Sequence, residues 1–159
     1  ALHRIMRMLT MFMFVAVLVP ALVASDGPRQ TVPRTVNLTA SDAMEFSLST
    51  FAVKPGESIR VVLRAVGTQP ADRMSHNFVL LKSTADIPTF IMMASLAREE
   101  GYFPRTLKSD VIAATSLVGA GESTSVTFHA PVRLGAYPYV CSFPGHSNAG
   151  MRATMIVRR

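Results

Sequence analysis

Short stretches of alternating apolar and polar residues, separated by turns, make up most of this 159-residue sequence from residue 36 onward. Ile59, Val61 and Leu63 recur at every second position of one such stretch, as expected for a half-buried strand. A turn at residues 53–57, which contains Pro and Gly, precedes it. Seven or eight such segments predict an all-β sandwich or barrel. The predicted strands are residues 36–40, 44–51, 58–66, 76–82, 111–115, 123–129, 136–142 and 153–157.

One segment has helical rather than alternating periodicity. Asp86 is a suitable N-cap, and Pro88 falls in the first turn that would follow it. Apolar residues then repeat with helical spacing, and Gly101 can end the helix. We therefore predict one helix over residues 87–100, inserted among the strands.

The first 25 residues have the layout of a secretory signal, with basic residues, an apolar run from Met8 to Val23 and small residues at 23–25. The run of about 16 residues is short for a membrane-spanning helix, which needs about 20. An uncleaved anchor is the alternative, and only then is the membrane a partner. We expect an exported protein, periplasmic or extracytoplasmic, with a flexible lead-in at 26–33 and a single domain at 34–159.

The composition excludes several classes of protein. A chain with one Cys forms no intramolecular disulfide, zinc finger or all-Cys iron–sulfur cluster. Three His residues outside the leader are too few for a multinuclear centre built on imidazoles. The Lys and Arg residues outside the leader are spread along the chain without interleaved aromatic residues. Nucleic acid is therefore not expected as a partner.

The residues that carry chemistry lie between the last two predicted strands. Cys141, His146 and Met151 place a thiolate, an imidazole and a thioether within eleven residues, around a bend at residues 144–145. Soft sulfur ligands with imidazole suit copper, in both oxidation states, better than magnesium or calcium. Two His and one Cys in a plane, with a weak axial Met, form the ligand set of a blue-copper electron-transfer site.

Such a site needs a second imidazole. His3 lies in the leader, and His129 ends a predicted strand with no ligand-like neighbour. His76 begins a predicted strand, which places it at an end of a sandwich, where the Cys–His–Met loop must also lie. We therefore predict that His76 is the second His ligand. Each of these residues taken alone is more often an inert part of a core, so the hypothesis rests on their combination.

At these residues the sequence resembles the cupredoxins, and within them the azurin and auracyanin group. Residues 75–80 (Ser-His-Asn-Phe-Val-Leu) look like the first-ligand motif, and residues 141–146 (Cys-Ser-Phe-Pro-Gly-His) are close to identical to the azurin copper loop. Residues 111–128 look like the azurin segment ahead of that loop, and the predicted helix lies where azurins insert a helical flap. The resemblance covers most of the chain after the leader and implies a Greek-key β-sandwich or barrel.

The resemblance also implies a role for each residue of the site. One copper ion, cycling between Cu(II) and Cu(I), would have three equatorial ligands and one axial thioether. The backbone carbonyl of Ser75 would lie on the opposite axial side, and Asn77 and the backbone N–H of Phe143 would hydrogen-bond the Cys141 sulfur. The three equatorial ligands and the axial thioether would be His76, Cys141, His146 and Met151.

Three features depart from the azurin pattern. Ser75 stands where azurins have Gly, and Phe78 stands where azurins often have Trp. Four residues separate His146 from Met151, one more than in typical azurins, and this spacing resembles auracyanins.

The resemblance implies a one-electron carrier rather than an enzyme. Its partners would be redox proteins such as c-type cytochromes, or membrane respiratory or photosynthetic complexes. They would dock near His146, where the electron would leave. The alternative is a copper-binding protein for copper delivery or storage. A copper oxidase or reductase would need further imidazoles. The residues expected to form an apolar docking patch around His146 are Met74, Phe143, Pro144 and Ala149.

Overall fold

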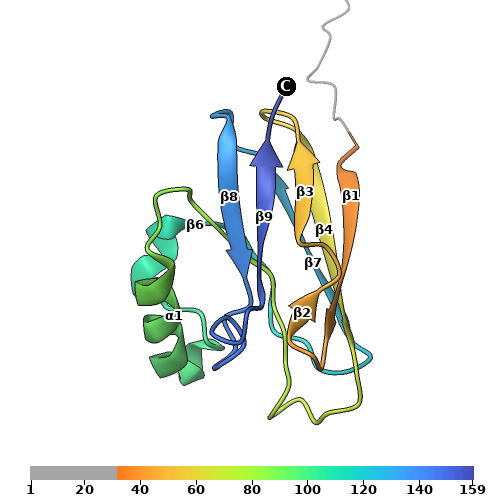
Figure 1. Cartoon of the computed structure of the whole chain (residues 1–159), viewed down its shortest axis with the longest axis vertical. Coiled ribbons are helices and arrows are strands. Elements are labelled where there is room, and N and C mark those ends of the chain that lie inside the picture. The colour runs from red at the N-terminus through yellow and green to blue at the C-terminus, as the bar shows by residue number, and fades with distance from the viewer. Residues whose placement is uncertain (1–31) are drawn as a thin grey trace, which may run out of the picture. The chain divides into compact units, whose positions relative to one another are not determined.

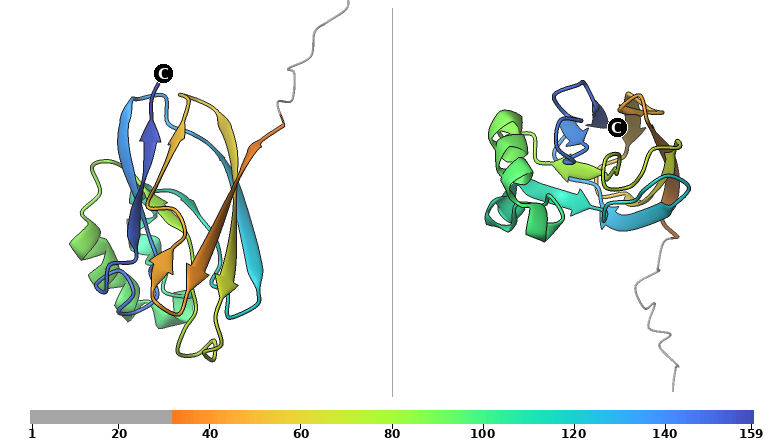
Figure 2. Two further views of the ribbon diagram at one scale, coloured as in Figure 1. Left: turned by 45° about the vertical axis from the view of Figure 1, so that its right-hand side comes forward. Right: turned by 90° about the horizontal axis from the view of Figure 1, so that it is seen from below.

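Two mixed β-sheets packed face to face form the core of residues 32–159, which are the residues described by the computed structural model (Figures 1 and 2). The predicted leader at 1–25 and most of the lead-in at 26–33 lie outside the described residues. The nine strands of the described part are β1 (Arg34–Ser41), β2 (Glu45–Phe46), β3 (Thr50–Val53), β4 (Ser58–Val66), β5 (Val79–Leu81), β6 (Val111–Ala114), β7 (Ser123–His129), β8 (Gly135–Val140) and β9 (Arg152–Val157).

The first sheet has the strand order β2-β1-β4-β7, and the second has the order β3-β9-β8-β5-β6. β1 pairs in parallel with β4, and β3 pairs in parallel with β9, whereas all other pairs are antiparallel. The chain crosses from one sheet to the other after β2, β3, β4, β6 and β7. The predicted all-β sandwich is therefore confirmed, with nine strands instead of seven or eight.

The additional strand arises within residues 44–51, which were predicted as one strand. The chain instead forms β2 in the first sheet and then crosses to β3 in the second. The backbone N–H of Ser47 donates to the Thr39 carbonyl, and its hydroxyl accepts from the Thr39 N–H, each at 2.9 Å. Phe46 and Phe51 nevertheless pack into one core. The alternation of apolar and polar residues through 44–51 is therefore continuous although the chain changes sheet within this segment.

The inserted helix α1 (Ile87–Leu96) is shorter than predicted. Asp86 is its N-cap, as expected, and accepts a hydrogen bond from the Thr89 N–H. The Ala97 N–H bonds to the Ala94 carbonyl, three residues back, and a 3₁₀ turn at Arg98–Glu100 follows. Gly101, with φ of 66°, ends this turn rather than the helix. No helix of the described residues is long and apolar enough to cross a membrane.

The second sheet is buried on both faces where β5 and β8 pair. Leu80 and Tyr139 point into the core between the sheets. Val79 and Val140 point the other way, into a smaller cluster that α1 covers with Phe90. β5 is much shorter than the predicted strand at 76–82, because the residues before it depart from the ladder to form the site at the end of the sandwich.

Candidate metal centre

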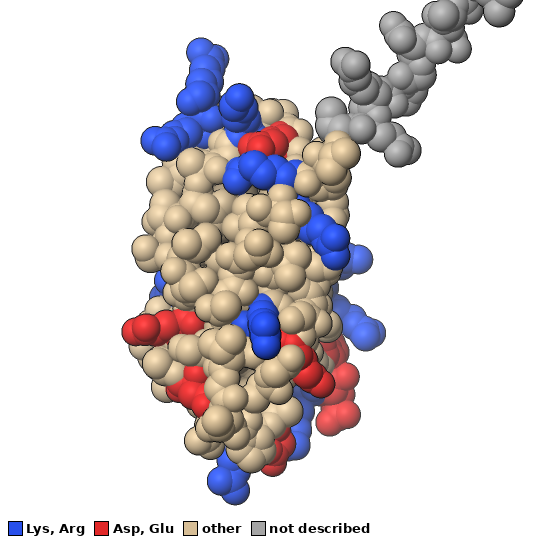
Figure 3. All heavy atoms as spheres, turned by 90° about the vertical axis from the view of Figure 1, so that its right-hand side faces the viewer, with Lys and Arg blue, Asp and Glu red and all other residues tan. Residues whose placement is uncertain are grey.

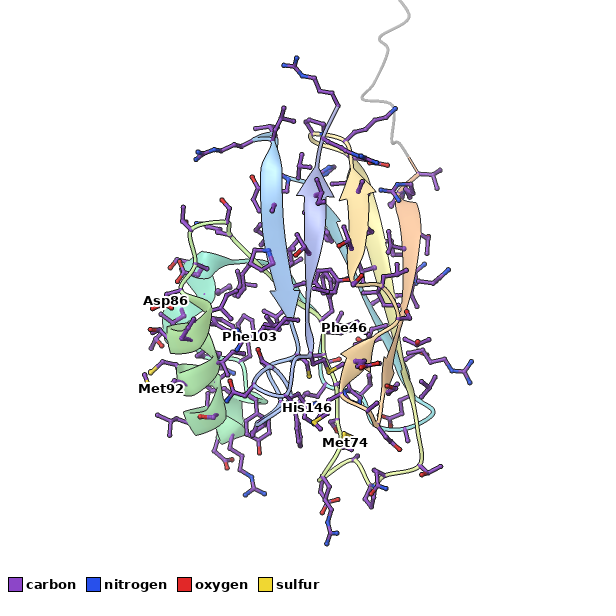
Figure 4. The ribbon with its side chains drawn as sticks, viewed as in Figure 1. Phe46, Met74, Asp86, Met92, Phe103 and His146 are labelled. Atoms are coloured by element: carbon purple, nitrogen blue, oxygen red, sulfur yellow. The ribbon has the colours of Figure 1, made fainter. Side chains whose placement is uncertain are left out.

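The predicted ligands meet at one end of the sandwich. His76 lies just before β5, and Cys141 directly follows β8. His146 and Met151 lie in the loop from β8 to β9, and Figure 4 shows His146 at the end of the molecule where β8 ends. The ends of β5, β8 and β9 thus bring together residues that are up to 75 positions apart in the sequence, from His76 to Met151.

The three predicted equatorial residues converge closely. One potential ligand atom from each of His76, Cys141 and His146 lies within 4.8 Å of the others. The Cys141 Sγ is 3.5 Å from His146 Nδ1, and the two imidazole rings have centroids 4.9 Å apart. All three side chains are at most 2 % exposed. His129, rejected as a ligand, is exposed at the far end of β7.

The Cys–His–Met loop is closed by its own backbone. Gly145 adopts φ of 85°, a left-handed conformation that favours Gly, and the His146 N–H bonds to the Phe143 carbonyl at 3.2 Å. The Met151 N–H donates to the His146 carbonyl at 3.0 Å, and the Met151 carbonyl accepts from the Cys141 N–H at 3.2 Å. Met151, 1 % exposed, is therefore folded back beside Cys141.

The first-ligand segment is held against another loop. The N–H and carbonyl of His76 exchange two hydrogen bonds of 2.9 Å with Val118. Two residues on, the Phe78 N–H donates to the Thr115 hydroxyl at 3.0 Å. These bonds replace the interrupted ladder and place the imidazole at the sheet end.

The ring nitrogens of His76 lack hydrogen-bond partners within the described residues, and a metal ion could take the place of such partners. Both nitrogens are buried. Burial raises the pKa of the Cys141 thiol to about 11, although the backbone N–H groups of Asn77 and Phe143 donate to it and act in the opposite direction. A bound cation would coordinate an imidazole nitrogen and offset the cost of a buried thiolate. One thiol and two imidazoles suit copper.

Both imidazoles are held in the neutral form that a metal requires. Burial lowers the pKa of His76, against a smaller opposing effect of Asp42. Burial, together with the charge of the neighbouring His76, lowers the pKa of His146 to about 4. At neutral pH the site therefore offers free nitrogen lone pairs without first losing a proton.

Comparison with known proteins agrees with this geometry. The family model described as "Copper binding proteins, plastocyanin/azurin family" matches residues 34–158. The chain belongs to the plastocyanin/azurin family, the cupredoxins. Copper is therefore its cofactor, as predicted, and the His–Cys–His site is that of a blue copper protein.

Individual relatives are also similar over most of the chain. An azurin of Pseudomonas denitrificans is 34% identical over 126 residues, which are 77% of this chain and 97% of that protein. Auracyanin-B of Chloroflexus aurantiacus is 32% identical over 139 residues, 85% of this chain and 55% of that protein. This cupredoxin thus spans about half the length of that relative. The dithionite-reduced auracyanin of the photosynthetic bacterium Roseiflexus castenholzii superimposes with a TM-score of 0.67 and 26% identity, over 81% of this chain and 100% of that one.

In this cupredoxin, Ser142 is a site residue that sequence reasoning missed. The Asn77 side chain donates from Nδ2 to the Ser142 hydroxyl and accepts from the Ser142 N–H, both at 2.8 Å, and both residues are 1 % exposed. Asn77 thus ties the His76 segment to the Cys141 segment with its side chain and faces the sulfur with its backbone N–H. The only sequence feature that could have indicated these hydrogen bonds is the presence of a small polar residue directly after Cys141.

We expect Asn77→Ala to lower the free energy of unfolding by about 2–3 kcal/mol, because two buried hydrogen bonds are lost and the Ser142 groups stay unsatisfied. Urea unfolding of the metal-free protein measures this. Asn148→Ala is the matched control, because Asn148 is exposed in the same region. Its effect should stay within about 0.5 kcal/mol. An equal loss in both variants would show that the Asn77 contacts do not join the two segments.

Ser75 occupies the predicted place beside the site. Its hydroxyl donates to the Ala71 carbonyl at 2.5 Å, and its own carbonyl oxygen lies 4.0 Å from the Cys141 sulfur. The side chain that replaces the Gly of azurins therefore bonds back into its own loop, and the carbonyl still faces the sulfur.

The predicted apolar patch is only partly at the surface. His146 is 2 % exposed and Phe143 9 %, and their ring centroids are 4.8 Å apart. Tyr102, from the segment after α1, packs edge-on against Phe143 at 5.3 Å, a contact that no sequence pattern indicated. Pro144 and Met74 are half-buried, whereas Ala149 is exposed. The imidazole lies just beneath the surface rather than on it.

The lowered histidine pKa values predict a pH dependence of the metal-free protein. His146 has a pKa near 4 when folded but about 6.5 when unfolded, so the unfolded state binds more protons between these values. Stability should be full above about pH 6.5 and fall as the pH drops toward 4, by up to about 1.4 kcal/mol per pH unit for each histidine. Urea midpoints from pH 7 to 5 measure this. His146→Gln should flatten the slope relative to that of the unaltered protein. A slope unchanged in His146→Gln would contradict the assignment.

Proposed function

We propose that this cupredoxin is an exported one-electron carrier, and that it is not an enzyme. The observation that carries the proposal is the burial of the whole donor set, with His76, Cys141, His146 and Met151 each at most 2 % exposed. An enzyme needs an open coordination position that a substrate can reach, whereas an electron needs only proximity. The bound copper ion would supply the chemistry by cycling between Cu(II) and Cu(I).

We propose that His76, Cys141 and His146 would hold the copper ion, that Met151 would be a further, weaker ligand, and that the Ser75 carbonyl would approach the ion as well. The convergence within 4.8 Å and the 4.0 Å separation of the Ser75 oxygen from the sulfur support this. The backbone N–H groups of Asn77 and Phe143 would stabilise the thiolate and tune the potential.

The role of the protein is to keep these ligands fixed while the charge of the site changes. The Asn77–Ser142 hydrogen bonds hold Cys141, the Val118 bridge holds His76, and the closed loop backbone holds Met151. A site fixed from three sides changes oxidation state with little rearrangement, which favours fast electron transfer. The same closure disfavours copper delivery, because release requires the loop to open.

The electron would leave through His146, and redox proteins such as c-type cytochromes or membrane respiratory or photosynthetic complexes would dock over Phe143, Pro144, Met74 and Ala149. The support is the Phe143 ring packed on the imidazole beneath partly exposed apolar residues. Weak redox encounters use small interfaces of this kind. The apolar leader sequence supports a periplasmic or otherwise extracytoplasmic location.

The test is a redox titration of the copper-loaded protein. We expect one electron equivalent per protein to bleach the visible band, and one equivalent of oxidant to restore it fully over repeated cycles. Incubation with a copper-free acceptor protein tests the alternative of copper delivery. Irreversible bleaching, a stoichiometry other than one, or transfer of copper to the acceptor on reduction would each contradict the carrier function.

A further inference from the structure

A second surface, at the end of the sandwich opposite the metal centre, carries an excess of positive charge. We call it the far end: residues 32–34, 52–58, 129–135 and 157–159, where β3, β7 and β9 end and β1, β4 and β8 begin. Figure 3 shows Lys and Arg side chains gathered there. Glu57 is the one acidic residue of these segments, and it pairs with Arg34 at 2.6 Å. The cations of the far end are Arg34, Lys54, Arg133, Arg158 and Arg159.

The same end also exposes apolar side chains. Val32 is 92 % exposed, Val132 80 % and Leu134 48 %, and these are three of the six large apolar side chains exposed in the described residues. Val132 and Leu134 flank Arg133 in the loop from β7 to β8. Exposed apolar residues among cations are the composition of surfaces that lie in the headgroup region of a bilayer.

We propose that the far end binds the surface of a bilayer that contains anionic phospholipids. The cations would contact the headgroup phosphates, and Val132 and Leu134 would enter the interface between headgroups and acyl chains. A groove of about 400 Å³ at the far end is lined by Arg34, Lys54, Arg158 and Arg159, and also by Glu57, which is paired with Arg34. The three remaining cations outnumber this carboxylate, so the groove keeps a positive charge that suits a phosphate group. This proposal does not depend on electron transfer, because none of these residues belongs to the metal centre.

The connection of the chain favours a lipid surface over an acidic protein. β1 begins with Arg34, so the residues that precede the described part join the domain at the far end. The apolar run from Met8 to Val23, if retained, would tether this same end to a bilayer. Because the metal centre is at the opposite end of the sandwich, far-end binding would leave it uncovered (Figure 1).

The test uses the absence of Trp from the chain. Val132→Trp in the full chain gives a single fluorescent reporter at the far end, and Leu96→Trp, at a position 76 % exposed on α1, is the matched control. Each variant, metal-free, is mixed with phosphatidylcholine vesicles with and without phosphatidylglycerol. We expect V132W emission to shift to shorter wavelength with phosphatidylglycerol only, reversibly in high salt. L96W emission should not shift.

Charge removal then tests the cause. Lys54→Gln, Arg158→Gln and Arg159→Gln combined in V132W should weaken binding to the anionic vesicles by about fivefold per cation, hence about a hundredfold. The equally charged control K82Q/R64Q/K108Q changes exposed cations elsewhere and should bind as V132W does. Three results would overturn the proposal. The first is an equal emission shift in V132W and L96W, and the second is a V132W shift that does not depend on phosphatidylglycerol or salt. The third is unchanged binding of the V132W variant that also carries K54Q, R158Q and R159Q. A V132W shift with polyglutamate but none with vesicles would overturn it as well, and would assign the end to an acidic protein.

Discussion

We expect the replacement of Cys141 by alanine to abolish the intense visible band of the copper-loaded protein. The band arises from charge transfer between a thiolate and copper, and Cys141 is the only Cys of the chain. No other residue can supply the thiolate, so the expected loss is complete rather than partial. An absorption spectrum during titration with Cu(II) measures it, and reductant should bleach the band of the unaltered protein.

The control for this substitution is Ser147→Ala, which alters a buried residue of the same loop outside the donor set. It should keep the band. The Cys141→Ala protein itself should stay folded, because it removes one small buried group, and its far-ultraviolet circular dichroism should match that of the unaltered protein. A folded C141A protein that stays blue would contradict the assignment of the thiolate ligand.

Replacing Phe78 by alanine should give the largest loss of stability, about 3–5 kcal/mol. Phe78 is 0 % exposed, and its ring centroid lies 5.1 Å from that of Tyr139 in the core between the sheets. Tyr139 also packs against Phe46 and Phe51, so the cavity opens at the centre of an aromatic cluster. Since single domains unfold with about 5–15 kcal/mol, this loss would be a large part of the total.

Urea unfolding of the metal-free Phe78→Ala protein, with the slope m compared with that of the unaltered protein, measures the loss. Phe78→Leu should cost less, because leucine leaves a smaller cavity. Phe103→Ala is a second control, because Phe103 is only half-buried at the edge of the smaller cluster under α1. Equal losses for Phe78→Ala and Phe103→Ala would contradict the central packing role of Phe78.

The elements that could be predicted were those whose signal is local. The alternation of Ile59, Val61 and Leu63 indicated β4 with its observed bounds, and Asp86 marked the start of α1. The boundaries that failed depend on distant partners. The chain changes sheet at residues 47–49 because Ser47 bonds to Thr39, and β5 is short because His76 pairs with Val118. Neither pairing could be predicted from the local pattern of apolar and polar residues.

The candidate site divides in the same way. The loop from Cys141 to Met151 could be recognised because its donors are close in sequence and of one chemical kind, and His76 followed from the need for a second imidazole. The two hydrogen bonds between Asn77 and Ser142 and the packing of Tyr102 on Phe143 could not be predicted from the sequence. The residues of these two pairs are 65 and 41 positions apart in the sequence, and their residue types do not mark them as partners.

The sequence alone therefore determined the candidate donor set, the metal that it suits and the sandwich that holds it, because residue type and short-range spacing carry that information. Only the tertiary structure decided that the donors, predicted to meet at one end, are almost completely buried there, and that the scattered cations Lys54, Arg133 and Arg158 gather at the other end. The physical reason is that burial and charge clustering depend on which strand ends meet in space. The pairing of whole strands sets this, and pairing is cooperative over the entire chain.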